Sequence, residues 1–117
     1  MQDYKTLKVW QKSHYLVLDV YEVSKSFPKE EMFALTTQLK RACYSIPSNI
    51  AEGCGKHSQA DLAKFLQIRL GSANEVEYFF LLCRDLNYIE DNTYEGLVEK
   101  INEIRAMLIK LIQKVRS

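Results

Sequence analysis

Apolar residues recur at steps of three and four along most of the chain, which is the spacing of one face of an α-helix. The pattern stops at three places rich in Pro, Gly, Asp or Asn, which are residues 26–28, 53–55 and 91–93. It therefore predicts four helical segments, which cover approximately residues 7–26, 28–52, 58–86 and 91–117. Short connections place consecutive helices side by side in opposite directions. We expect one all-α domain over residues 1–117, an antiparallel up-down-up-down four-helix bundle.

Each segment carries its own predicted core face. The first segment supplies Leu7, Trp10, His14, Val17, Leu18 and Tyr21. The second supplies Phe33, Leu35, Leu39, Ala42, Ile46 and Ile50. The third supplies Leu62, Phe65, Leu66, Val76, Phe79, Phe80, Cys83 and Leu86. The fourth supplies Tyr94, Leu97, Ile101, Ile104, Leu108, Leu111 and Val115. Beside this last face lie Val98, Ile109 and Ile112, which predict apolar surface left over for a second partner.

The second segment also has a polar stripe at helical spacing. It consists of Gln38, Arg41, Ser45, Asn49 and Glu52. Such short and mixed side chains favour a buried or interfacial polar network, with an ordinary solvated stripe as the alternative. The third segment supplies Ser72 and Glu75 to this predicted network, with Glu75 as the partner of Arg41. Pro47 removes a helical hydrogen bond in the middle of the stripe and predicts a bend.

Two local signals concern the third segment. Ser58 with Asp61 three residues later predicts a capped helix N-terminus. Gly71 costs about 1 kcal/mol of helix stability relative to Ala, which predicts that it allows a close approach to Ala42 of the second segment.

Several stretches resemble one known family. They are LKVWQKS near the start, FPKEEMFAL, QLKRACYSIPSNIAEG at residues 38–53 and GSANEVE at residues 71–77. Together they resemble the 23S rRNA intervening-sequence proteins, S23-type four-helix bundles, over nearly the whole chain. The resemblance implies a small bacterial cytosolic protein that assembles as a ring, with a homopentamer as the expected size. It also implies kinship with the accessory protein of diversity-generating retroelements, which works beside a reverse transcriptase and binds nucleic acid.

The composition narrows the class of protein without naming a partner. Hydrophobic residues make up 47% of the 117 residues, enough for a real core. Sixteen Lys and Arg against fifteen Asp and Glu leave a formal net charge of +1. The three cysteines lack disulfide-framework spacing, the start lacks an apolar signal core, and no apolar run approaches the ~18 residues of a membrane span. We expect a cytoplasmic protein without membrane association.

No motif predicts catalysis. Residues 26–29 match S-x-x-K, but the further motifs of the enzymes that use it are absent, so a helix junction is the better interpretation. Cys54 and His57 have C-x-x-H spacing without a second pair of ligands, which argues against a metal site. Cys43 and Cys83 lie within the apolar periodicity and are expected in the core. We therefore expect no enzyme, no metal and no cofactor.

Charge is distributed unevenly. Residues 85–103 hold six acids and one Lys, whereas residues 104–117 hold four cations and no acid. In an up-down bundle the start of the first helix, the turn with His57 and Lys64 after the second, and the end of the fourth meet at one pole. The cations of this predicted basic pole are Lys5, Lys8, Lys12, Lys56, Lys110, Lys114 and Arg116. The first three stand where the helix dipole disfavours cations, so helix stability does not explain them.

Two functions from different classes fit these observations. The first is a nucleic-acid-binding ring that gathers its basic poles on one face and contacts RNA or DNA backbone. The second is an adaptor that binds a protein, for example a reverse transcriptase, through leftover apolar surface. In the second case the basic pole only aids solubility.

Overall fold

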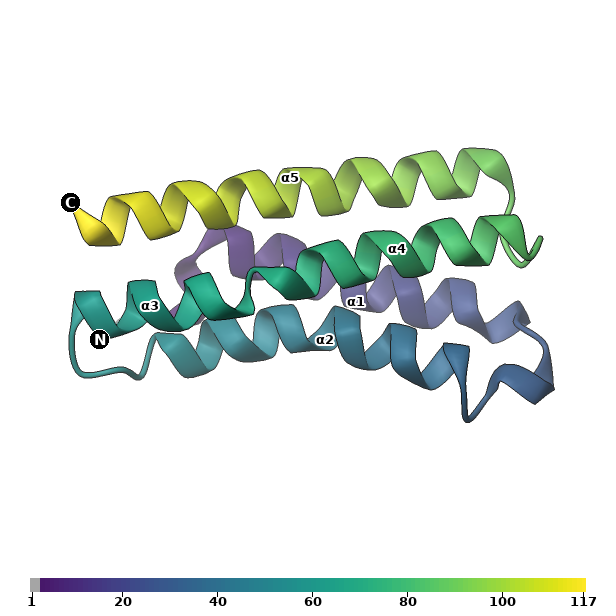
Figure 1. Ribbon diagram of the computed structural model, residues 1–117, viewed down its shortest axis with the longest axis horizontal. Helices are drawn as coiled ribbons and strands as arrows, with labels where there is room; N and C mark the ends of the chain where they lie inside the picture. Colours follow the sequence, from purple (N-terminus) through teal and green to yellow (C-terminus); the bar gives the residue numbers. More distant parts are fainter. Residues whose placement is uncertain (1–2) are drawn as a thin grey trace.

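The computed structural model describes residues 3–117, in which helices are joined by short turns and there is no strand. Its long helices are α1 (Lys8–Val23), α2 (Leu35–Gly53), α3 (Gln59–Arg69), α4 (Gly71–Asp85) and α5 (Asp91–Arg116). The short 3-10 helices η1 (Tyr4–Thr6), η2 (Ser24–Ser26) and η3 (Lys29–Glu31) lie before α1 and between α1 and α2. Figure 1 shows α3 and α4 following one another end to end, and together they lie alongside α1, α2 and α5. The molecule measures 44 × 24 × 21 Å.

The packing of the helices brings separate chain segments together at two distinct ends of the molecule. α1 contacts α2 and α5, and α4 contacts the same two helices, while α3 packs on α5 and α2. Figure 1 shows the end of α5 and the α2–α3 turn at one end, and the α1–α2 and α4–α5 connections at the other. We call residues 3–8, 52–64 and 106–117 the basic end, and residues 24–34 and 85–95 the acidic end. No helix within residues 3–117 is long and apolar enough to cross a membrane.

The helical period predicts the inner faces of α2 and α5 well. On α2 the buried apolar residues include Leu35, Leu39, Ala42, Ile46 and Ile50. On α5 they are Leu97, Ile101, Ile104, Leu108 and Ile112. Because Ile112 is buried and Val98 half-buried, only Ile109 of the three extra residues is exposed. The predicted apolar surface on α5 is therefore wrong for Ile112 and reduced to Ile109 and part of Val98, and a partner that covers it stays a prediction.

The predicted core face of α1 is wrong, because the buried face is rotated from it by part of a helical turn. The residues buried in the structure are Val9, Ser13, Leu16 and Val20. The predicted residues are half-buried (Leu7, Trp10, His14 and Val17) or exposed (Leu18 and Tyr21). Ser13 can lie in the core because its hydroxyl donates a hydrogen bond to the Trp10 carbonyl at 2.9 Å.

α2 begins at Leu35, not at residue 28 as predicted. Pro28 leads into η3 and a turn at residues 32–34, where Ala34 has φ −125° and ψ −106°. Phe33, predicted in the core, is 91% exposed on this turn. Pro47 is buried inside α2, which remains one helix and is bowed along its length in Figure 1.

The predicted third helix is two helices. α3 ends at Arg69 and α4 begins at Gly71, with Leu70 at the joint. A Cβ on Gly71 would meet nothing within 4 Å, so the predicted close approach to Ala42 is wrong. The predicted cap is confirmed, because the Ser58 hydroxyl accepts a hydrogen bond from the Asp61 N–H at 3.1 Å.

Gly53 and Gly96 differ in the space around them. A Cβ on Gly53 would lie 2.9 Å from Leu62 Cδ1 and 3.2 Å from Phe65 Cδ2, so Gly53 lets the end of α2 pack closely on α3. Gly96 is exposed within α5, and a Cβ there would meet nothing within 4 Å. A mid-helix glycine costs about 1 kcal/mol relative to Ala, and packing within the chain gives no reason for it.

Candidate nucleic-acid interface

The basic end gathers cations from three separate parts of the chain. Its residues include seven Lys and Arg against three Asp and Glu. The cations are Lys5, Lys8, Lys56, Lys64, Lys110, Lys114 and Arg116. Contacts of η1 with α2 and of α3 with α5 bring the three segments together. The excess of positive charge is therefore a property of the fold and is invisible in the net charge of the chain.

Most of these cations form no ion pair. The ion pairs within residues 3–117 are Lys12–Glu103, Lys25–Glu22, Lys56–Glu52, Arg84–Asp85, Lys100–Asp19 and Arg105–Glu77. Of the cations at the basic end, only Lys56 takes part in one of these pairs. The other six cations carry charge that no described carboxylate offsets at short range.

Two predicted members of the basic pole have carboxylate partners. Lys12 Nζ lies 2.8 Å from Glu103 Oε1 in the groove between α1 and α5. Lys56 Nζ lies 3.9 Å from Glu52 Oε2 and 4.6 Å from the centre of the Phe65 ring. A ligand phosphate would have to displace these partners, so both lysines are less available to bind one than the unpaired cations.

The start of α1 lacks the groups that normally stabilise a helix N-terminus. Its N-cap residue Leu7 makes no side-chain cap, its first turn contains no acid, and its first residue is Lys8. The positive end of the helix dipole and the Lys8 ammonium therefore repel one another. At the end of α5, by contrast, the dipole favours Lys114 and Arg116. An anion bound beside Lys8 would offset the repulsion.

The polar stripe of α2 lies on the surface of the molecule. The exposed residues are Gln38, Arg41, Glu52 and, on α4, Glu75; the half-buried ones are Ser45, Asn49 and, on α4, Ser72. Arg41 and Glu75 form no ion pair within residues 3–117, so the predicted interior pair is wrong. The reason is rotational, because the buried face of α2 is centred on Leu39, Ala42 and Ile46 and leaves Arg41 outside it. A network at an interface between copies stays a prediction.

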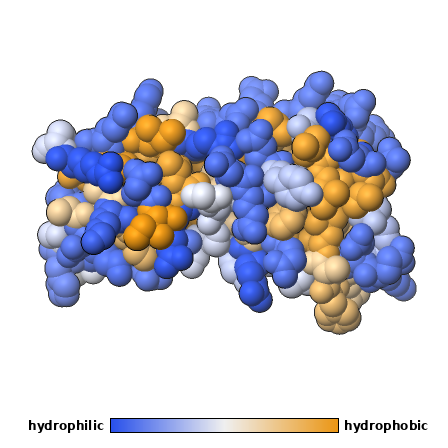
Figure 2. All heavy atoms as spheres, in the orientation of Figure 1, coloured by the Kyte–Doolittle hydropathy of each residue, from blue (hydrophilic) through white to orange (hydrophobic). Residues whose placement is uncertain are grey.

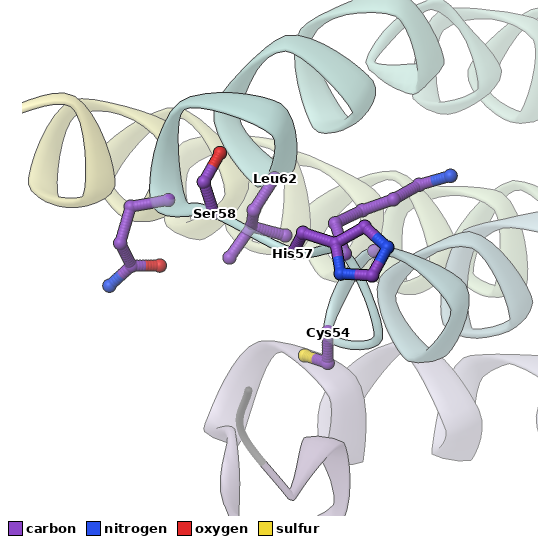
Figure 3. A pocket seen from close by; sticks show the side chains of 7 residues that line it. Cys54, His57, Ser58 and Leu62 are labelled. Atoms are coloured by element: carbon purple, nitrogen blue, oxygen red, sulfur yellow. The ribbon is translucent and has the colours of Figure 1, made fainter.

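The α2–α3 turn surrounds a hollow of about 340 Å³. Figure 3 shows that the Cys54 sulfur points away from the His57 imidazole, so the C-x-x-H pair does not converge on a common ligand. No group of three or more His, Cys, Asp or Glu in the described part of the chain could hold a metal ion. Burial raises the pKa of the Cys54 thiol, and it raises the pKa of Cys43 to about 12 and of Cys83 to about 11. All three cysteines are buried, two of them in the predicted core positions.

The 23S rRNA-intervening sequence protein family model matches residues 5–110, and the chain belongs to this family. Its fold is similar to that of a protein with unknown function from the S23 ribosomal protein family of Bacteroides thetaiotaomicron VPI-5482. The two chains are 32% identical with a TM-score of 0.81, over 90% of this chain and 95% of that chain. No functionally curated protein matches. Neither the family description nor the name of the solved relative indicates an enzyme.

Proposed function

We propose that this protein is a non-enzymatic, cytoplasmic RNA-binding protein. Its antiparallel four-helix bundle assembles as a ring, with a homopentamer as the expected size, and the basic ends on one face bind RNA backbone. The observation that carries the proposal is the gathering, at one end, of six cations outside every ion pair of the described residues. These are Lys5, Lys8, Lys64, Lys110, Lys114 and Arg116.

The chemistry of this surface favours phosphate over bases. Lysine ammonium groups act as point charges toward phosphate oxygens and carry no base-specific geometry. Each protomer offers only a small cluster, but a ring repeats it, and a strand that spans several copies gains avidity. The family description ties its members to an intervening sequence of 23S rRNA, which makes RNA the first ligand to test. We expect little sequence preference.

The test compares two variants that lose the same charge. The first replaces Lys8, Lys110 and Lys114 with Gln, and the matched control replaces Lys25, Lys29 and Lys40, which lie outside the basic end. Filter binding to a single-stranded RNA should show at least about tenfold weaker binding for the first variant at low salt. The control should bind as the natural protein does. Equal affinity of both variants, with equal mass and helicity, would refute the basic end as the RNA site.

A second candidate function is an adaptor for a protein partner such as a reverse transcriptase. It is favoured by the exposed apolar side chains outside the basic end, above all Phe33. An adaptor without a nucleic-acid role requires that the natural protein show no salt-dependent RNA binding at all, which the same titration detects.

A further inference from the structure

Four aromatic side chains lie in contact, one after another, where the chain enters α1. The Tyr4 ring meets the Trp10 ring edge to face, with 5.0 Å between the ring centres. The Trp10 indole is stacked on the His14 imidazole, with centres 5.2 Å apart and planes inclined by 5°. The centre of the His14 imidazole lies 6.0 Å from that of the Tyr15 ring, at an angle of 45°. We call Tyr4, Trp10, His14 and Tyr15 the aromatic ladder.

The two halves of the aromatic ladder differ in their surroundings. Tyr4 and Trp10 are half-buried and pack against the hydrophobic core. His14 is half-buried and Tyr15 is 63% exposed, and neither belongs to the buried face of α1. Core packing therefore accounts for the first two aromatic side chains and gives no reason for the other two.

Hydrogen bonds fix η1 against the start of α1. The Asp3 carboxylate accepts a hydrogen bond from the Lys5 N–H at 3.0 Å. The Gln11 side-chain amide donates to the Lys5 carbonyl at 2.8 Å, which ties η1 to the first turn of α1. Lys5 Nζ lies 5.7 Å from the centre of the Tyr4 ring. Because these contacts already order the aromatic ladder, a ligand that stacks on it pays little further ordering entropy.

Unpaired cations of the basic end lie beside the aromatic ladder. Lys5 and Lys8 form no ion pair within residues 3–117. Lys8 and Tyr15 are seven residues apart in α1, which places them on one face of the helix about 10 Å apart along its axis. The carboxylate one turn beyond Tyr15 is Asp19, and it is paired with Lys100 at 2.6 Å. A single strand with a phosphate at Lys8 can therefore bring a nearby base to Tyr15.

The exposed apolar turn at the other end of the molecule has the opposite electrostatic setting. Phe33 is 91% exposed there, where Figure 2 shows an apolar projection at the lower right. The acidic end around it holds six Asp and Glu against two Lys, which repel phosphate. The aromatic ladder instead begins in η1, within the basic end, and continues along α1, which lies behind α4 in Figure 1. Exposed aromatic side chains beside cations are the elements with which proteins bind single-stranded nucleic acid.

We propose that the aromatic ladder binds unpaired RNA bases by stacking. The proposal rests on the RNA binding of the proposed function and adds base contacts to its phosphate contacts. One base stacks on the Tyr15 ring, and a neighbouring base stacks on the His14 imidazole, which the Trp10 indole supports from behind. Phosphates of the same strand lie at Lys5 and Lys8. Since every base offers a π-face, stacking selects single-stranded RNA over duplex without selecting a sequence.

Two strands that differ only in their bases test the stacking. One is a short single-stranded RNA, and the other has the same length and the same phosphates but carries a stable abasic site at every position. At equal salt concentration the natural protein should bind the first strand at least about tenfold more tightly, the effect of one stacked base. Equal affinity for the two strands would overturn the stacking and leave the salt-dependent backbone binding of the proposed function standing.

Ring deletions assign the preference for bases to the aromatic ladder. Tyr15→Ala and His14→Ala should each reduce the ratio of the two affinities, and the double variant should bring it close to one. Tyr15→Phe keeps the aromatic ring and should keep the ratio. Tyr78→Ala removes a similarly exposed aromatic ring from α4 and should keep it as well. Circular dichroism checks that each variant is folded, and an unchanged ratio in the folded double variant would overturn the aromatic ladder as the stacking site.

A fluorescent base reports the stacking in the natural protein. The emission of 2-aminopurine falls when its ring stacks, so a strand whose only base is 2-aminopurine should lose emission on binding, and less so with Tyr15→Ala. Unchanged emission on binding would overturn the stacking. The variant with Lys8, Lys110 and Lys114 replaced by Gln should bind both strands more weakly and keep their affinity ratio. A natural protein that binds neither strand would refute the proposed function and the stacking together, whereas a base preference without salt dependence would refute the phosphate contacts alone.

Discussion

The Tyr88 hydroxyl donates a hydrogen bond of 2.7 Å to the Glu31 carboxylate, 57 residues earlier in the chain. The bond joins the α4–α5 connection to η3 at the acidic end. Tyr88 also packs beside Phe27, with 5.5 Å between ring centres. The two residues thus fix the path of the chain into the turn at residues 32–34.

Tyr88→Phe tests this hydrogen bond through its pH dependence. The bond to Glu31, with burial and nearby carboxylates, raises the pKa of Tyr88 from 10.0 to about 12. Because the pKa is higher in the folded state, the bond contributes its full stability below pH 10 and loses it as the pH rises toward 12. We expect Tyr88→Phe to lower the melting temperature at neutral pH, and the difference to shrink across that interval. Thermal melts of Tyr88→Phe and the natural protein between pH 7 and pH 12 measure this difference in melting temperature.

The matched control for this substitution is Tyr78→Phe. Tyr78 is exposed on α4 and makes no side-chain hydrogen bond within the described residues. Its loss should leave the melting temperature unchanged at every pH. Identical melts of Tyr88→Phe and the natural protein at neutral pH would show that the bond does not stabilise the fold.

A second prediction concerns the ion pair between Arg105 of α5 and Glu77 of α4. Their side chains are 24% and 40% exposed, and Arg105 also donates to Asn102 at 2.8 Å. Glu77→Ala should cost about 1–2 kcal/mol in denaturant melts, between the values for buried and exposed pairs. Glu22→Ala, which breaks a pair with 73% and 74% exposed side chains, should cost about 0.5 kcal/mol or less. Equal costs would contradict the structural role of the first pair.

A third prediction concerns glycine packing. Gly53→Ala should destabilise the protein by about 1–3 kcal/mol, because its Cβ would crowd buried Leu62 and half-buried Phe65. Gly71→Ala adds the same methyl group in open space and should be neutral or slightly stabilising. Urea melts of the two variants and the natural protein measure these changes in the free energy of unfolding. A Gly53→Ala protein as stable as Gly71→Ala would mean that the α2–α3 contact adapts freely.

The sequence predicts the fold where the helical period and the buried face coincide. On α5, the step of three and four from Leu97 to Leu108 falls on the core at every residue. On α1 the same rule fails, because Ser13 is polar and still buried through a hydrogen bond to its own helix. An apolar stripe that omits Ser13 is displaced toward Trp10 and Tyr21. Hydrophobic spacing alone therefore misplaces a face whose centre is polar.

Tertiary contacts explain the other failures. The exposed turn that carries Phe33 is fixed in part by Tyr88, far away in sequence, and no local pattern contains that information. The basic end itself follows from the order of the helices and could be predicted. The ion pair between Lys12 and Glu103 could not be predicted, since it depends on how α1 is rotated against α5. The polar stripe was recognisable as a pattern, but its exposure depends on the same rotation of α2.

The slope of RNA affinity against salt concentration tests the central claim most directly. If a ring contacts about six phosphates of a single strand, log K should fall with log salt at a slope near −4. Replacement of Lys8, Lys110 and Lys114 by Gln should flatten this slope, while replacement of Lys25, Lys29 and Lys40 should leave it unchanged. A natural protein whose RNA affinity does not depend on salt, or a basic-end variant that keeps the full slope, would contradict RNA binding by the basic end.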